Sequence, residues 1–138
     1  MKRVLISQSV GDFISIPEHH GFEIEISERV LEKAADFIAR ESSPPLLLLI
    51  FADKNEFEQL YRFFRTYHYT EAVFRCILIN PDKEELSVDE DRVGFILDYR
   101  VSSIPENEAL FIINKAFHQM DSFFRSSLTR DEYMAQLT

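Results

Sequence analysis

The sequence is short of cysteine, glycine and long apolar runs, and each shortage excludes a class of protein. The single cysteine, Cys76, excludes a disulfide within the chain and is typical of a reducing, cytoplasmic setting. No apolar run approaches the roughly 20 residues that a membrane-spanning helix needs. After the basic start, Ser7-Gln8-Ser9 breaks the apolar stretch that a signal peptide would require. The three glycines are isolated from one another, which argues against the glycine-rich phosphate loop of a dinucleotide enzyme.

Basic residues are also in deficit, with 15 Lys and Arg against 24 Asp and Glu and a formal net charge of −9. An acidic surface repels phosphate backbones and anionic lipids, so neither nucleic acid nor a membrane is an expected partner. The 138 residues, 46% of them apolar, suffice for one domain with a genuine hydrophobic core. No internal repeat, linker or low-complexity segment divides the chain.

An unbroken apolar run from Leu46 to Ala52 dominates the sequence, opened by Pro44-Pro45 and closed by Asp53. A strand with one wet face alternates polar and apolar residues, whereas a continuous run indicates burial on both faces. The length suits a strand, and the two prolines disfavour a helix before it. Because burial on both faces requires helices above and below, the run predicts a parallel sheet in an α/β domain.

Strands and helices are expected to alternate around this run. Further strands are predicted at residues 3–10, 22–26, 73–79 and 93–97. Helices are predicted from Ser27 to about Glu41, after Asp53 to about residue 66, and from Glu106 past Phe124. Helices near residues 11–16 and 82–92 are expected to be short or absent. With right-handed crossovers, these elements predict a (βα)5 domain: a doubly wound, five-stranded parallel sheet in the order 2-1-3-4-5, with a long C-terminal helix.

The order of elements, together with Asp98-Tyr99 and the following Pro105-Glu106-Asn107-Glu108, resembles the receiver domain of two-component response regulators. In that family, a strand ending in an Asp-Tyr-type segment leads through a lysine and a proline into the last helix. The resemblance covers residues 1–125. It implies a flavodoxin-like, receiver-like fold for this region and a role in signal transduction.

The residues of the family's phosphorylation site are largely replaced in this chain. Receivers carry two acids after the first strand, a phosphoaccepting aspartate after the third, a Ser or Thr after the fourth and a lysine after the fifth. The corresponding positions here hold Ser7-Gln8-Ser9, Asn80-Pro81 and Ser102-Ser103, and only Asp53 matches. Without acidic partners to hold Mg²⁺, Asp53 lacks the metal that phosphorylation requires. Its capping box with Glu56 explains it structurally, so the chain resembles a degenerate receiver, or pseudo-receiver.

Other residues that could carry chemistry have simpler interpretations. His19-His20 sits in a turn without a cysteine or acid at ligand spacing, and His68 and His118 belong to helices. Cys76 lies in an apolar strand and is expected to behave as a small hydrophobic residue. The run Asp89-Glu90-Asp91 lacks the spacing of a calcium loop. We therefore expect no catalytic residue, cofactor or metal.

The last helix is the most informative functional feature of the sequence. Leu110, Ile113, Phe117, Met120 and Phe124 follow alternating steps of three and four residues, and Ala109, Ile112 and Ala116 form a second line. Core packing explains the first turns. Phe117, Met120, Phe124 and Leu128 form a stripe that a short sheet would not wholly cover, which predicts a homodimer through this helix. Residues 126–138 are expected to extend the helix toward a downstream output domain.

Two functions remain open on this reading. The first is a non-catalytic signalling module that acts by protein contact as the N-terminal part of a larger regulator. The alternative is a small-molecule sensor or enzyme that uses the C-terminal ends of the strands, where such folds bind ligands. Its site would be lined by Ser7, Ser9, Asp53, Asn80 and Ser102.

Overall fold

The computed structural model describes residues 2–18, 21–40, 47–66, 74–80 and 94–127 of the chain, with side chains up to Ser122. Its elements, in order, are β1 (Lys2–Ser7), the 3-10 helix η1 (Gln8–Phe13), β2 (Glu23–Ser27), α1 (Val30–Arg40), β3 (Leu47–Ala52), α2 (Lys54–Thr66), β4 (Phe74–Ile79), β5 (Ile96–Arg100) and α4 (Glu106–Ser127).

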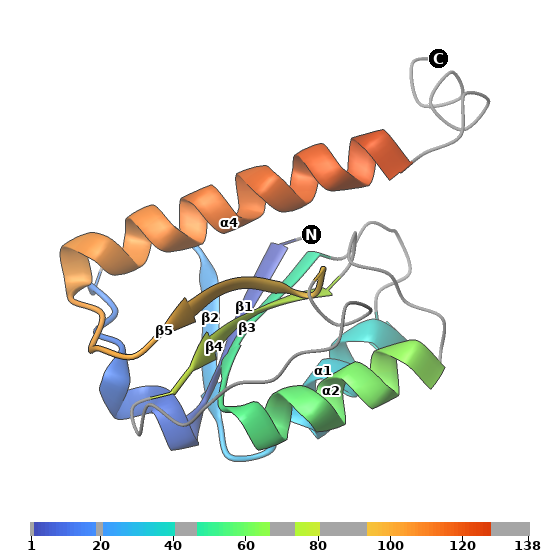
Figure 1. Cartoon of the computed structure of the whole chain (residues 1–138), viewed down its shortest axis with the longest axis horizontal. Helices are drawn as coiled ribbons and strands as arrows, with labels where there is room; N and C mark the ends of the chain where they lie inside the picture. The colour runs from blue at the N-terminus through green and yellow to red at the C-terminus, as the bar shows by residue number, and fades with distance from the viewer. Residues whose placement is uncertain (1, 19–20, 41–46, 67–73, 81–93, 128–138) are drawn as a thin grey trace.

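The five strands form one parallel sheet in the order β2-β1-β3-β4-β5, which confirms the predicted α/β architecture. Figure 1 shows α4 across one face of the sheet and α1 and α2 on the other. The chain moves outward from β1 to β2 and then returns to the other side of β1 to form β3. The order of the strands therefore reverses between β1 and β3, which is where folds of this kind bind ligands.

The central strand β3 is buried along its whole length, as the apolar run predicts. Successive side chains of a strand point to opposite faces. Leu49 therefore enters the core beneath α4, whereas Leu48 enters the core formed with α1 and α2. Both side chains are 0% exposed, so the sheet is covered equally well on its two faces at this point.

The first strand is shorter than the predicted range of residues 3–10, because the chain turns into η1 after Ser7. The side-chain oxygen of Ser7 accepts a hydrogen bond from the backbone N–H of Ser9 at 3.3 Å, which favours a turn over a continued strand. Val10 is nevertheless buried in the core beneath α4. Beyond η1, Ile14 forms a parallel bridge with Ile104, so an extended segment takes the place of a first long helix.

The last strand is displaced toward the C-terminus relative to the predicted residues 93–97. Phe95 precedes β5 and is buried against α2, where its ring meets the Tyr61 ring edge-on at a centroid distance of 5.4 Å. The packing of the Phe95 ring, rather than the run of apolar residues in the sequence, sets where β5 begins. Asp98 and Arg100 lie within β5, and such charged residues are common on an edge strand because they discourage pairing with other chains.

The helices on the other face begin with polar side chains that satisfy free backbone N–H groups. The Ser27 hydroxyl accepts a hydrogen bond from the N–H of Arg29 at 3.0 Å, and α1 starts at Val30, three residues later than Ser27. In α2 the predicted apolar face is confirmed. Its buried residues are Phe57, Leu60, Tyr61 and Phe64.

The long helix α4 packs most of its two predicted apolar lines on its own sheet, although Leu110 is only half-buried. Its buried residues are Ala109, Ile112, Ile113, Ala116, Phe117 and Met120. Phe117 and Met120, at 2% and 0% exposed, are therefore core residues, which corrects the predicted interface at these two positions. The sheet reaches further under the helix than we expected: the Lys2 ammonium, at the start of β1, pairs with the Asp121 carboxylate at 2.8 Å. Beyond that ion pair, α4 continues to Ser127.

Some predictions concern residues outside the described part of the chain. These are His19-His20, His68, the segment 82–92, the Phe124 side chain, and Leu128 with the rest of the predicted extension to residue 138. His118 lies exposed on α4. Among the described helices, none has the length and apolar character needed to cross a membrane.

Candidate functional site

Polar side chains gather at the C-terminal ends of β1 and β3, where the strand order reverses. Ser7 is the last residue of β1, Ser9 follows in η1, and Asp53 comes directly after β3. Because β1 and β3 are adjacent and parallel, these ends lie at the same edge of the sheet. The structure therefore brings together three of the five residues predicted for a strand-end site.

A fourth side chain, Glu56 from the first turn of α2, completes this strand-end cluster. The Ser9 hydroxyl lies 3.0 Å from the Asp53 Oδ2 atom and 2.6 Å from the Glu56 Oε1 atom. Whichever of these two oxygens accepts its proton, Ser9 donates to a carboxylate. The Ser7 hydroxyl donates to the Glu56 Oε2 atom and lies 3.0 Å from the Ser9 hydroxyl. Both serine hydroxyls are thus occupied by the two carboxylates.

The carboxylates are also tied to the beginning of α2. The N–H of Glu56 donates to Asp53 Oδ1 at 2.9 Å, and the N–H of Asp53 donates to Glu56 Oε1 at 3.2 Å. These reciprocal bonds are the predicted capping box, which is thereby confirmed. The positive end of the helix dipole further favours two negative charges at this place.

Loss of the cap should weaken the protein measurably. We expect Asp53→Ala to lower the free energy of unfolding by about 1 kcal/mol, because one N–H at the start of α2 loses its acceptor. Asp53→Asn keeps a side-chain oxygen and should retain most of the stability. Urea unfolding followed by circular dichroism measures both variants. Equal losses for Asn and Ala would show that negative charge, rather than capping, is what Asp53 supplies.

The other two residues of the predicted site lie apart from this cluster. Asn80 is buried and donates from its amide nitrogen to the Tyr99 hydroxyl at 2.5 Å, and its backbone N–H bonds to the carbonyl of Arg100. Asn80 therefore ties the end of β4 to β5. Ser102 is exposed in the connection between β5 and α4. Glu56 was expected only as a cap, although its position three residues after Asp53 already indicated that it would reach back to the strand ends.

The chemistry available at the strand-end cluster is limited. Its hydroxyls have carboxylates beside them, but the four described residues include no histidine to act as the base of a nucleophilic serine. Within the described part of the chain, no group of three or more His, Cys, Asp or Glu is placed to hold a metal ion. The cluster binds its own helix and strands together.

Cys76 is likewise unsuited to reactive chemistry. It lies in β4 within the core beneath α2 and is fully buried. Burial raises the pKa of its thiol, and the nearby carboxylate of Glu56 raises the pKa further. The thiol therefore stays protonated at ordinary pH, as expected for a cysteine that acts as a small hydrophobic residue.

A second polar group of three residues joins β5 to α4. The Arg100 guanidinium donates from Nε to Asp98 at 2.9 Å and from Nη1 to Glu108, in the first turn of α4, at 2.5 Å. Burial alone would lower the pKa of Arg100, but the hydrogen bonds to Asp98 and Glu108 outweigh it and raise the pKa above its usual value. Arg100 therefore carries a permanent positive charge here.

Comparisons with protein-family models, with curated proteins and with solved structures found no match to this chain.

Proposed function

We propose that the chain is a non-catalytic signal-transduction module, receiver-like in fold but without a phosphorylation pocket, that acts in the cytoplasm by protein contact. The observation that carries the proposal is the engagement of Asp53. One of its carboxylate oxygens caps α2 and the other lies within hydrogen-bonding distance of Ser9. A phosphoaccepting aspartate would instead need a bound Mg²⁺ beside it.

The positions that would hold such an ion support the same conclusion. Ser7 and Ser9 stand where a receiver carries its acidic pair, and their hydroxyls already donate to Asp53 and Glu56. Neutral hydroxyls are weaker Mg²⁺ ligands than carboxylates. Two carboxylates that are both engaged in hydrogen bonds would hold Mg²⁺ weakly, and without the ion nothing neutralises the charge of an incoming phosphoryl group.

The absence of phosphotransfer can be tested directly. With Mg²⁺ and either acetyl phosphate or beryllofluoride added, we expect no saturable change in the amide NMR signals of Asp53 and its neighbours. The Asp53→Asn variant is the control, because it removes the acceptor and keeps the cap. Saturable shifts in the wild type that disappear in this variant would overturn the proposed function.

Protein contact is the mechanism that the outer side of α4 supports. Phe111 is 66% exposed there, the most exposed of the described large apolar side chains. Covering an aromatic ring that is otherwise exposed to water lowers the free energy, and so favours association with a partner. With Phe117 and Met120 in the core, we propose that a homodimer forms through Phe111 on the outer side of α4. The contacts predicted at Phe124 and Leu128 continue the line of Phe117 and Met120 and stay predictions.

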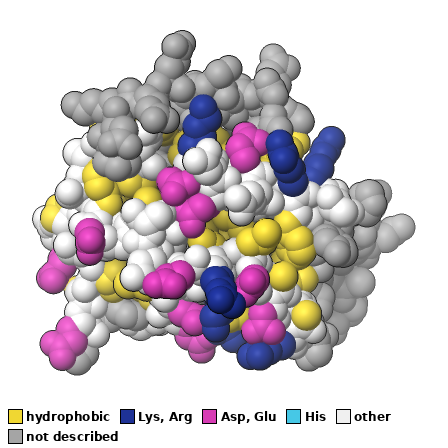
Figure 2. Space-filling view, turned by 90° about the horizontal axis from the view of Figure 1, so that it is seen from below, with side chains coloured by type: hydrophobic (Ala, Val, Ile, Leu, Met, Phe, Trp, Pro, Cys, Tyr) yellow, Lys and Arg dark blue, Asp and Glu magenta, His cyan; other side chains and the backbone are white. Residues whose placement is uncertain are grey.

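The charge of the surface supports a protein partner rather than a nucleic acid. Figure 2 shows the face covered by α1 and α2, where acidic side chains are spread among apolar ones. Among the described residues of this face, the Lys and Arg side chains stand in separate groups instead of a continuous stripe. A phosphate backbone would be repelled by such a surface.

Self-association should depend on Phe111. In sedimentation velocity at high protein concentration, we expect the wild type to dimerise and Phe111→Glu to remain monomeric. Ile26→Glu is a matched control. Ile26 is also exposed, at 55%, but it lies on β2, at the edge of the sheet opposite β5. Each copy carries −9, so moderate salt should strengthen the dimer by screening repulsion. A wild type that stays monomeric at both low and moderate salt would refute the contact.

A second candidate function is a small-molecule sensor at the strand ends. A hollow of about 320 Å³ between the first turns of α1 and α2 borders the strand-end cluster. Arg29, Glu56 and Gln59 contribute polar groups to its wall. A ligand in this hollow would contact Glu56 and so reach the hydrogen bonds of Ser7 and Ser9.

A further inference from the structure

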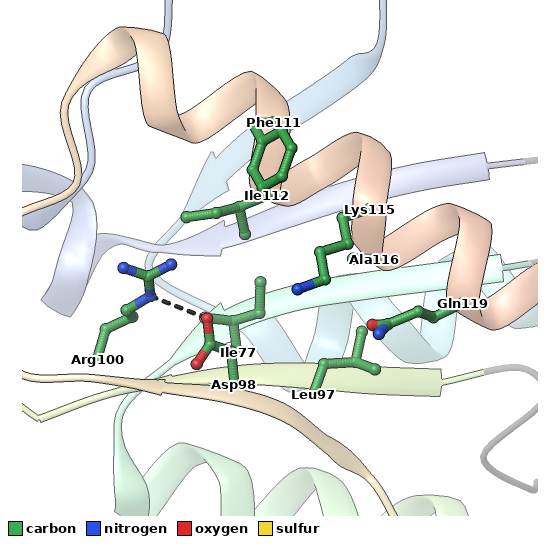
Figure 3. A pocket seen from close by; sticks show the side chains of 9 residues that line it. All are labelled: Ile77, Leu97, Asp98, Arg100, Phe111, Ile112, Lys115, Ala116 and Gln119. Carbon is green, nitrogen blue, oxygen red and sulfur yellow. Dashed lines mark hydrogen bonds and ion pairs between the residues drawn. The ribbon is translucent and has the colours of Figure 1, made fainter.

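A separate pocket lies on the other face of the sheet, between the edge strand β5 and α4 (Figure 3). Its volume is about 150 Å³, the size of an apolar cavity that accommodates a benzene ring. Figure 3 shows Arg100 toward one end, Leu97 and Gln119 toward the other, and the Lys115 side chain between them. The exposed ring of Phe111 also borders the pocket.

A bulge in β5 builds the floor of this pocket. The register of the β4–β5 ladder shifts so that Cys76 pairs with Ile96 while Ile77 pairs with Asp98. Leu97 is the extra residue, and both Leu97 and Asp98 line the pocket although adjacent strand residues normally face opposite ways. The bulge thus places an apolar and a charged side chain side by side beneath α4.

The remaining walls are apolar. Ile77 rises from β4, and Ile112 and Ala116 come from the buried side of α4. With Leu97 and the Phe111 ring, they surround a space suited to a flat or branched hydrocarbon group. Such a group would be removed from water on several sides, which favours its binding.

The polar groups of the pocket select the charge of the ligand. Both oxygens of Asp98 are already used, by the N–H of Tyr99 at 2.8 Å and by Arg100 at 2.9 Å. Arg100 uses Nε and Nη1 in its bonds to Asp98 and Glu108, which leaves Nη2 without a hydrogen-bond partner among the described residues. Within the same part of the chain, the Lys115 ammonium and the Gln119 amide also have none. The free groups are therefore mainly donors, two of them on cations, and donors of this kind bind an anion.

We propose that this pocket binds a small organic acid, with its carboxylate on Lys115 and Arg100 Nη2 and its apolar body between Leu97, Ile112 and Phe111. The charge of Arg100 is balanced by Asp98 and Glu108, so the cation of this pocket that pairs with no described carboxylate is the Lys115 ammonium. The proposal does not rest on the contact function, because all of the lining residues belong to one copy of the chain.

Benzoate is the probe that matches this volume and charge. Titrated into a dilute solution of the protein, it should produce saturable shifts in the amide NMR signals of Leu97, Asp98 and Lys115. Benzamide has the same shape without the charge and should bind about tenfold more weakly, the loss expected for one charge-assisted hydrogen bond. Inorganic phosphate has the charge without the apolar body and should also bind more weakly than benzoate. Equal affinity for benzoate and benzamide would overturn the assignment.

Variants separate this site from adventitious binding. Lys115→Met should reduce benzoate affinity about fivefold, since an exposed cation is partly screened by water. Lys54→Met, which removes the same charge from α2 on the opposite face, should leave the affinity unchanged. Phe111→Ala should also weaken benzoate binding, and because Phe111 is exposed this variant keeps the fold. Equal losses in both lysine variants, or shifts centred on other residues, would overturn the proposal.

Discussion

Replacing Leu48 with aspartate is expected to prevent the protein from folding. Leu48 is 0% exposed in the core formed with α1 and α2, and the nearest described cation, Arg3 on the neighbouring strand β1, is already paired with Glu23. An unpaired carboxylate buried there costs several kcal/mol, a large share of the about 5–15 kcal/mol that stabilises a domain. Far-ultraviolet circular dichroism and the yield of soluble protein measure the outcome. A folded Leu48→Asp variant of near wild-type stability would contradict the double-sided burial of β3.

Alanine variants of the same strand give the matched comparison. Leu48→Ala and Leu49→Ala remove the same atoms from opposite faces of the sheet, and each should cost about 2–5 kcal/mol. Ile26→Ala, on the exposed face of an edge strand, is the control and should cost much less. A large loss for one leucine and none for the other would mean that one face of the sheet is open to solvent.

Replacing Phe117 with alanine is expected to destabilise the protein by about 3–5 kcal/mol. Its ring is 2% exposed and stacks on the ring of Phe22 at a centroid distance of 5.8 Å, so the change leaves a cavity between α4 and the sheet. Phe111→Ala removes the same side chain from the outer side of the same helix, where it is 66% exposed, and should cost much less. Urea unfolding of the two variants measures the difference.

The contrast between these two phenylalanines decides where the contact surface of α4 lies. A Phe117 variant that keeps its stability but no longer dimerises would restore the interface that the heptad spacing predicted. The expected result is the reverse: Phe117 supports the fold, and Phe111 supports association. Sedimentation of the folded fraction of each variant distinguishes the two outcomes.

The parallel sheet was predictable because its cause is local in the sequence. The apolar run ending at Ala52 has no polar position to face water, so it had to be buried on both faces, and only flanking helices provide that burial. The capping box of Asp53 and Glu56 was equally predictable, since both residues and the N–H groups they accept from lie within one turn of chain. Even the absence of a long first helix followed from Pro17.

Other features depended on contacts between distant residues, which no local pattern contains. The start of β5 was set by the burial of Phe95 against Tyr61, and the bulge at Leu97 by pairing with β4. Heptad spacing in α4 looks the same whether the partner is a second helix or the chain's own sheet. Only the fold, which carries α4 along the sheet as far as Asp121, assigned Phe117 to the core and left Phe111 in water.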